Sequence, residues 1–112
     1  MKARLPQGYG KQSMNDLMKQ AQLVQEKMAQ KQEELREKEY TATSGGGMIT
    51  VTMRGDHQVT AVKIDPEAVQ PDDVEMLEDM LAAAVNEAVR IADEDAETEL
   101  GAISGGLNIP GM

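Results

Sequence analysis

The 112-residue chain contains no cysteine, tryptophan or phenylalanine, and its only aromatic side chains are Tyr9 and Tyr40. The absence of cysteine excludes disulfides, thiol catalysis and metal sites built from cysteine. The single histidine, His57, excludes metal sites built from several histidines. Nine methionines take up part of the missing aromatic volume. Because methionine packs adaptably but specifies a rigid core poorly, this composition favours a fold whose stability depends on a partner.

The chain also lacks any apolar run that approaches the roughly 20 residues needed to span a membrane. Lys2 and Arg4 make its N-terminus basic, but no apolar segment follows them, so the sequence does not predict a secretory signal. We therefore expect a cytoplasmic protein with no membrane partner.

Positive charge is scarce outside the first third of the chain. The net charge is −9; residues 1–40 carry eight Lys or Arg and six Asp or Glu, whereas residues 41–112 carry three and fourteen. This asymmetry favours a polyanionic partner for the first third. The overall negative charge opposes such binding at long range, so any affinity for nucleic acid must come from a local cationic patch.

The sequence pattern predicts one α+β domain over residues 13–100, with a three-stranded antiparallel sheet between two long helices. The predicted elements are a helix over 13–39, strands over 40–44, 48–54 and 57–64, and a helix over 72–100. Residues 1–12 are predicted to be a flexible basic N-terminal arm and residues 101–112 a flexible C-terminal tail, because glycine and proline recur in both. The first helix is predicted to begin at Ser13, because Ser13 and Asp16 form a variant of the capping box.

Local signals support the other elements. Ile49, Val51 and Met53 alternate with polar residues, as in a strand with one buried face. Gly55-Asp56 stands where a tight hairpin turn is expected. Asp72-Asp73, after a proline, places negative charge at the positive end of the second helix dipole.

Three motifs that resemble functional sites have a simpler structural interpretation. Ser44–Gly47 is rich in glycine like a phosphate-binding loop, but a strand follows it instead of a helix, which favours a hairpin turn. The acidic segment 93–99 lacks the glycine and glutamate spacing of a calcium loop, so a solvated helix end is favoured. His57 has no partner arrangement for catalysis and is interpreted as an exposed strand residue. No pair of carboxylates is singled out for acid–base chemistry, so we expect no enzyme activity.

Apolar residues recur along both helices in a way that predicts a homodimer. Each helix is about twice as long as a sheet of six-residue strands, so part of each apolar stripe extends past the sheet. Such a stripe is unusual on a soluble monomer, and a second copy related by a two-fold axis is the simplest cover. The alternative is that the two helices fold back on each other within one chain. The predicted interface residues are Met14, Leu17, Ala21, Val24, Met28, Leu81, Ala84 and Ala88.

The cations of the helices form two candidate nucleic-acid contacts. Lys27, Lys31 and Lys38 lie within about 40° on one flank of the first helix, where they could contact phosphates. The alternative is that Lys31 and Lys38 pair with Glu34 at helical spacing. On the second helix, Asn86 and Arg90 lie opposite the apolar face. The alternative for Arg90 is an ion pair with Glu87 and Glu94 on its own helix.

Six segments of the chain resemble the YbaB/EbfC family of nucleoid-associated proteins. They occur in the family's order and cover nearly the whole chain. The segments are Asp16–Gln22, Gln25–Met28, Gly46–Val51, Val62–Pro66, Met76–Ala88 and Asn108–Gly111.

The resemblance implies an α-β-β-β-α subunit that forms a tweezer-like homodimer at the nucleoid. It also implies binding to double-stranded DNA with little sequence specificity and a role in chromosome organisation and gene expression. We expect no cofactor and no small-molecule substrate. By position, the family's DNA contacts fall on Lys19, Lys27, Asn86 and Arg90. The helix flank adds Lys31, and the basic arm adds Lys2, Arg4 and Lys11. The alternative function is an acidic adaptor that acts with the DNA replication or recombination machinery.

Overall fold

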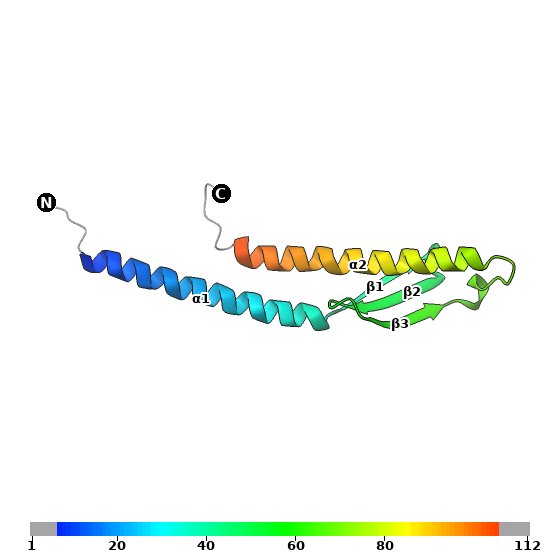
Figure 1. The fold of residues 1–112 in the computed structure, drawn as a ribbon, viewed down its shortest axis with the longest axis horizontal. Helices are drawn as coiled ribbons and strands as arrows, with labels where there is room; N and C mark the ends of the chain where they lie inside the picture. Colours follow the sequence, from blue (N-terminus) through cyan, green and yellow to red (C-terminus); the bar gives the residue numbers. More distant parts are fainter. Residues whose placement is uncertain (1–6, 106–112) are drawn as a thin grey trace.

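The computed structural model describes the backbone of residues 7–105 and the side chains from residue 13 onward. The elements are α1 (Gln7–Glu37), β1 (Glu39–Ser44), η1 (Gly45–Gly47), β2 (Ile49–Arg54), β3 (Val59–Ile64), η2 (Pro66–Ala68) and α2 (Val74–Gly105). The three strands form one antiparallel sheet in the order β1-β2-β3. The predicted α-β-β-β-α fold is confirmed. Figure 1 shows an elongated molecule with the sheet at one end and the outer half of α1 at the other.

Both helices extend further at their outer ends than the sequence predicted. α1 begins at Gln7 instead of residue 13, and α2 ends at Gly105 instead of residue 100. The prediction excluded these segments from the helices because they contain glycine. A glycine weakens a helix interior by only about 1 kcal/mol relative to alanine, so the helices continue through them. Residues 7–12 and 101–105 are therefore helical and not part of a flexible arm or tail. Residues 1–6 and 106–112 lie outside the described part of the chain.

The inner helix ends lie within two residues of their predicted positions. α1 ends at Glu37, and β1 follows from Glu39. α2 begins at Val74, because the Asp73 side chain accepts a hydrogen bond from the Met76 backbone N–H at 3.1 Å and so caps the first turn.

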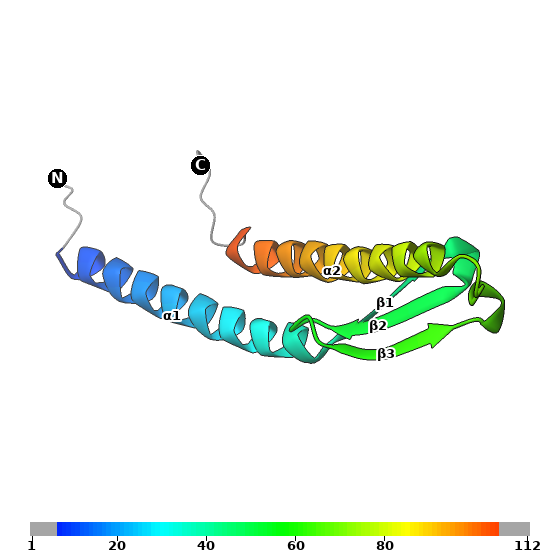
Figure 2. The ribbon, with the colours of Figure 1, turned by 45° about the vertical axis from the view of Figure 1, so that its right-hand side comes forward.

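The core lies between α2 and one face of the sheet. Ile49, Val51 and Met53 of β2 are fully buried, which confirms the predicted alternation. Ala84 and Ala88 of α2 pack against them and are also fully buried. Because alanine is small, it lets the helix backbone approach the sheet closely. Figure 2 shows α2 lying along β1 and β2.

Strand β3 keeps its apolar residues exposed. Val62 and Ile64 pair with Val51 and Ile49, and so they share the face that α2 covers elsewhere. They nevertheless remain 46% and 37% exposed, because α2 lies over the other two strands. Val59, at the start of β3, is similarly exposed. An uncovered apolar strip therefore follows this edge of the sheet.

The turn between β2 and β3 is a three-residue loop, Gly55–His57, and not the two-residue turn that the sequence predicted. The Arg54 N–H donates to the Gln58 carbonyl at 2.9 Å and closes the loop. His57 has a φ of +68°, the left-handed conformation that the last residue of such a loop adopts. β3 therefore begins at Val59, and His57 is a loop residue instead of the predicted strand residue.

This hairpin loop contacts the C-terminal end of α1. The Gly55 N–H donates to the Lys38 carbonyl at 2.9 Å, and the Asp56 N–H donates to the Arg36 carbonyl at 3.2 Å. Carbonyls at a helix C-terminus have no partner within the helix, so the loop satisfies two of them. The contact is so close that a Cβ atom on Gly55 would overlap the Leu35 carbonyl oxygen. The loop therefore holds the end of α1 beside the sheet.

We predict that Gly55→Ala destabilises the protein by about 3 kcal/mol, since backbone atoms must move to admit the methyl group. Gly101→Ala is the matched control, because its Cβ would meet no atom within 4 Å and alanine favours the helix. Urea unfolding followed by circular dichroism measures both variants. An unchanged midpoint for Gly55→Ala would show that the loop does not restrain α1.

Candidate nucleic-acid interface

One stripe along α2 connects the core to the ion pairs beyond the sheet. Ala84, Ala88, Ala92, Asp95 and Glu99 follow one another at intervals of three or four residues, so they lie on one side of the helix. We call these five residues the α2 stripe. Its three alanines are buried, whereas its two carboxylates contact lysines of the neighbouring segment of chain. The α2 stripe thus packs against the sheet through its alanines, and beyond the sheet its carboxylates form ion pairs.

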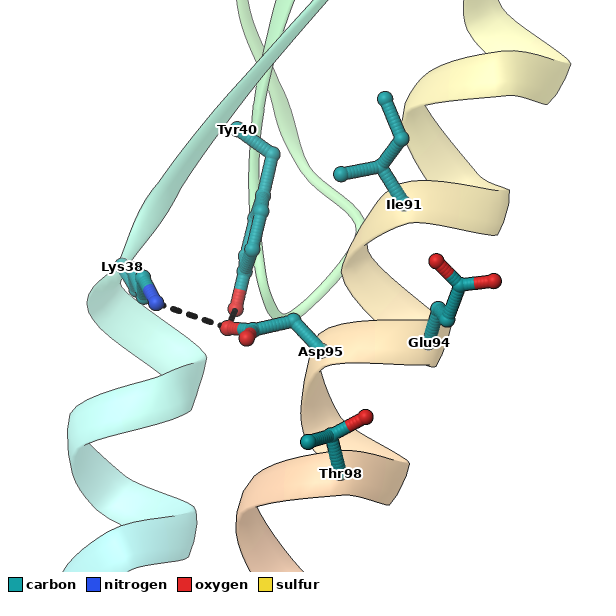
Figure 3. A pocket seen from close by; sticks show the side chains of 6 residues that line it. All are labelled: Lys38, Tyr40, Ile91, Glu94, Asp95 and Thr98. Atoms are coloured by element: carbon teal, nitrogen blue, oxygen red, sulfur yellow. Dashed lines mark hydrogen bonds and ion pairs between the residues drawn. The ribbon is translucent and has the colours of Figure 1, made fainter.

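Asp95 links the start of β1 to α2, as Figure 3 shows. One oxygen of Asp95 accepts hydrogen bonds from the Lys38 ammonium and from the Tyr40 hydroxyl, each at 2.7 Å. The hydrogen bonds from Lys38 and Tyr40 hold the pKa of Asp95 below its usual range. Burial and the hydrogen bond to Asp95 raise the pKa of Tyr40. The tyrosine is therefore a neutral donor to a charged carboxylate.

Lys31, one of the candidate DNA contacts, is held between the two helices. Its ammonium lies 3.2 Å from Glu34 of α1 and 3.3 Å from Glu99 of α2. Hydrogen bonds to Glu34 and then to Glu99 raise the pKa of Lys31. The ion pair with Glu34 was one of the alternatives from the sequence. Lys38, by contrast, pairs with Asp95 and not with Glu34.

Arg90, a second candidate, is bound by carboxylates of its own helix. It contacts Glu87 at 2.7 Å and Glu94 at 3.1 Å, chiefly through a two-pronged contact with Glu87. These contacts raise the pKa of Arg90, with Glu87 as the largest cause. Asn86 is exposed one turn earlier on the same face. This outer face of α2 also carries the exposed carboxylates Asp79 and Glu97. Asp93, at its edge, lies 2.8 Å from Nε2 of His57 in the β2–β3 loop.

Lys19 and Lys27 differ from the other candidate cations. Both are exposed on α1, and neither has an ion pair with any side chain between residues 13 and 105. Lys27 lies one turn from Lys31 on the same flank but further from the sheet. The sequence has no Asp or Glu after Glu99, so α2 offers no further carboxylate there. Among the candidate cations whose side chains the structure describes, Lys19 and Lys27 are therefore the two available to an external phosphate.

Three candidates lie partly or wholly outside the described region. The backbone of Lys11 belongs to α1, but its side chain is not described. Lys2 and Arg4 lie before the first described residue.

The predicted dimer residues fall into two groups in the structure. Met14 and Leu17 of α1 are 60% and 59% exposed. Ala21 is also exposed, whereas Val24 and Met28 are half-buried. On α2, by contrast, Ala84 and Ala88 are fully buried against the sheet of their own chain, and Leu81 packs beside them. The burial of Ala84 and Ala88 is thus accounted for within one chain. Among the predicted dimer residues, the free apolar surface is the part of α1 around Met14 and Leu17.

A model of the YbaB/EbfC DNA-binding family matches residues 10–107. The chain belongs to this family. A nucleoid-associated protein of Clostridium acetobutylicum is 49% identical over 105 residues, which cover 94% of each chain. Another from Clostridium kluyveri is 50% identical over 100 residues, which cover 89% of this chain and 88% of that one. The family predicted from the six segments is therefore confirmed.

The fold of this YbaB/EbfC chain also occurs in a crystal structure of an uncharacterized protein from Helicobacter pylori. The two share 23% sequence identity and a TM-score of 0.57, with 70% of this chain and 90% of that chain covered. Among residues 7–105, no helix is long and apolar enough to cross a membrane. No group of three or more His, Asp or Glu in the described region is arranged to hold a metal ion.

Two features of this YbaB/EbfC chain were missed by sequence reasoning. The acidic segment 93–99 was interpreted as solvated and His57 as lacking a partner. Asp95 and Glu99 instead form ion pairs with Lys38 and Lys31, and Asp93 lies 2.8 Å from His57 Nε2. The spacing of the α2 stripe was a usable signal, because the carboxylates continue the buried alanines at helical intervals. The apolar edge on β3 was the other omission, and it became visible only once α2 was placed over β1 and β2.

We predict that Asp95→Asn destabilises the protein by about 1 kcal/mol at pH 7, because the Tyr40 hydroxyl loses its charged acceptor. In the wild type, the pKa of Asp95 is lower in the folded than in the unfolded state. Its contribution is complete above the unfolded value of about 3.9 and is lost as pH falls through the folded value. The variant should therefore lose less stability than the wild type between about pH 4 and pH 2.

Asp79→Asn is the matched control, since Asp79 is exposed and has no ion pair within the described side chains. Thermal unfolding at several pH values gives the comparison. The role of Asp95 would be refuted by identical pH profiles for the two variants.

Proposed function

We propose that this chain is a nucleoid-associated protein that binds double-stranded DNA with little sequence specificity at the nucleoid in the cytoplasm. There it helps to organise the chromosome and influences gene expression. Family membership and the two clostridial relatives, both called nucleoid-associated proteins, support this proposal. The observation that carries it is the exposure of Lys19 and Lys27 on α1, free of internal ion pairs within residues 13–105.

The ion pairs of the described arginines support DNA binding without recognition of the base sequence. Arginine is the side chain that most often reads guanine, through two parallel hydrogen bonds. Within the described region, Arg36 pairs with Glu33, Arg54 with Asp56, and Arg90 with Glu87 and Glu94. Among the side chains of residues 13–105, the cations left for DNA are lysines, which act on phosphates as point charges and carry no base-specific geometry.

A homodimer accounts for the exposed apolar surfaces. The apolar stripe of α1 around Met14 and Leu17 and the β3 strip around Val62 have no cover within the described part of the chain. A second copy supplies matching apolar surface through a two-fold axis. The same axis doubles the set of α1 lysines, and a duplex can then contact lysines of both subunits. Two subunits thereby compensate for the small number of free cations in the described part of each.

A second candidate function is an acidic adaptor that acts with the replication or recombination machinery. The observation that favours it is the outer face of α2, which carries several exposed carboxylates and an arginine already bound by two of them. Capture of partners from a nuclease-treated lysate separates the two functions. An adaptor keeps its protein partners after nuclease treatment, whereas a DNA-coating protein loses them.

We predict that Lys19→Glu and Lys27→Glu each weaken binding to a short DNA duplex about tenfold at low salt, while the protein stays folded. For the wild type, log affinity should fall with log salt with a slope of about −0.9 per phosphate contacted. Each variant should show a shallower slope, because one contact per subunit is lost. Fluorescence anisotropy across a salt series measures both quantities.

Lys63→Glu is the control for this experiment. Lys63 is exposed on β3, has no ion pair within the described side chains, and gives the same change in net charge. Equal losses in all three variants would mean that net charge alone governs binding. A wild-type salt slope near zero would refute phosphate contact.

We also predict that the protein in solution has twice its 12.2 kDa chain mass. Leu17→Glu and Val62→Glu should each shift the mass toward that of one chain, because both put a charge into apolar contact. Gln20→Glu adds the same charge to an exposed polar position on α1 and should leave the dimer intact. Light scattering coupled to size exclusion measures the mass. A wild-type mass of one chain would contradict the dimer.

A further inference from the structure

The lysines on one flank of α1 experience different environments along the helix. Lys27 and Lys31 lie on the same flank of α1, and Lys38 directly follows the last residue of the helix. Lys31 and Lys38 contact carboxylates of α2, whereas Lys27 lies further along α1, beyond them. Lys38 is part of the arrangement around Tyr40 that stabilises the fold. Lys31 has no such role: its two partners, Glu34 and Glu99, are both carboxylates at the protein surface.

The position of Lys31 makes it the boundary of the cationic surface. Its side chain is only 30% exposed, while Lys27 on the next turn is exposed. Glu99 is the last acidic residue of the chain and belongs to the α2 stripe, so the core packing of α2 turns it toward α1. A carboxylate at 3.3 Å occupies the place that a phosphate oxygen would take on the lysine.

We propose that Glu99, together with Glu34, is an internal competitor for DNA phosphate at Lys31, and that it restricts phosphate contact to the part of α1 beyond α2. This inference rests on the proposed DNA binding and concerns its regulation. Lys31 is then a latent contact. DNA gains it only by displacing the two carboxylates, and the loss of Glu99 makes it available.

The competition is weak enough to be overcome. Exposed ion pairs are individually weak, so a dense line of phosphates can displace one when other contacts hold the duplex nearby. High salt weakens the ion pair and the phosphate contact alike. The competitor therefore tunes affinity over a small range and does not switch binding on or off.

Glu99→Gln tests the proposal, because it keeps the size of the side chain and removes only its charge. The variant should bind a DNA duplex about two- to fivefold more tightly than the wild type at low salt. Its log–log salt slope should be steeper by about 0.9 for each subunit, as expected for one additional phosphate contact. Glu34→Gln is a second variant that should shift affinity in the same direction.

The matched control is Glu97→Gln, two residues away on α2. It makes the same change in net charge, but Glu97 is exposed and has no ion pair within the described side chains. Lys31→Gln completes the comparison: alone it should barely change affinity, and combined with Glu99→Gln it should abolish the gain. Circular dichroism confirms that each variant is folded before its affinity is measured.

The outcomes separate this proposal from the one on which it rests. If the wild type binds DNA and Glu99→Gln and Glu97→Gln change its affinity equally, then Glu99 does not compete with phosphate at Lys31. The proposed DNA binding is unaffected by this result. The competition at Lys31 is also refuted if the gain in affinity from Glu99→Gln persists when Lys31 is replaced by Gln. Absence of binding by the wild type and every variant at low salt overturns both proposals. Tighter binding by Glu99→Gln that depends on Lys31 supports both.

Discussion

The packing of the α2 stripe against β2 is the contact on which the rest of the structure depends. Ala84 and Ala88 are fully buried in one cluster with inward side chains of β1 and β2, and this close packing fixes the rotation of α2 about its own axis. A helix is stiff over this length, so the same rotation sets the direction of Glu99, about 17 Å further along at 1.5 Å per residue from Ala88. The core thus decides which carboxylates face α1 and which face solvent.

Most of the fold could be predicted because its signals are local. The alternation through Ile49, Val51 and Met53 indicates a strand with one buried face, and the structure confirms it. The helix ends were less predictable. Glycine near an end suggests a stop, but its cost is small compared with the gain from continuing a long helix. The start of α1 at Gln7 and the end of α2 at Gly105 reflect this balance.

The candidate site could be predicted only in part, because most of its cations have several carboxylates within reach. Lys38 and Arg90 illustrate the difficulty. Helical spacing indicated Glu34 as an ion-pair partner of Lys38. The actual partner is Asp95, which is distant in the chain and brought close by the fold. For Arg90 the local alternative holds, with Glu87 and Glu94 as partners. Helical spacing identifies neighbours on one helix, and only the tertiary arrangement decides between them and a residue from elsewhere.

The same arrangement explains how a chain with a net charge of −9 can offer a cationic surface. Lys19 lies twelve residues from Lys31 along α1, which corresponds to about 18 Å of helix. This distance is about twice the Debye length of about 8 Å at physiological salt, so the carboxylates of α2 are largely screened from Lys19. At very low salt that screening is lost, and repulsion between DNA and the acidic α2 then opposes the stronger lysine–phosphate attraction. For the proposed DNA binding, the distance between Lys19 and the carboxylates of α2 is therefore what lets local attraction dominate at physiological salt.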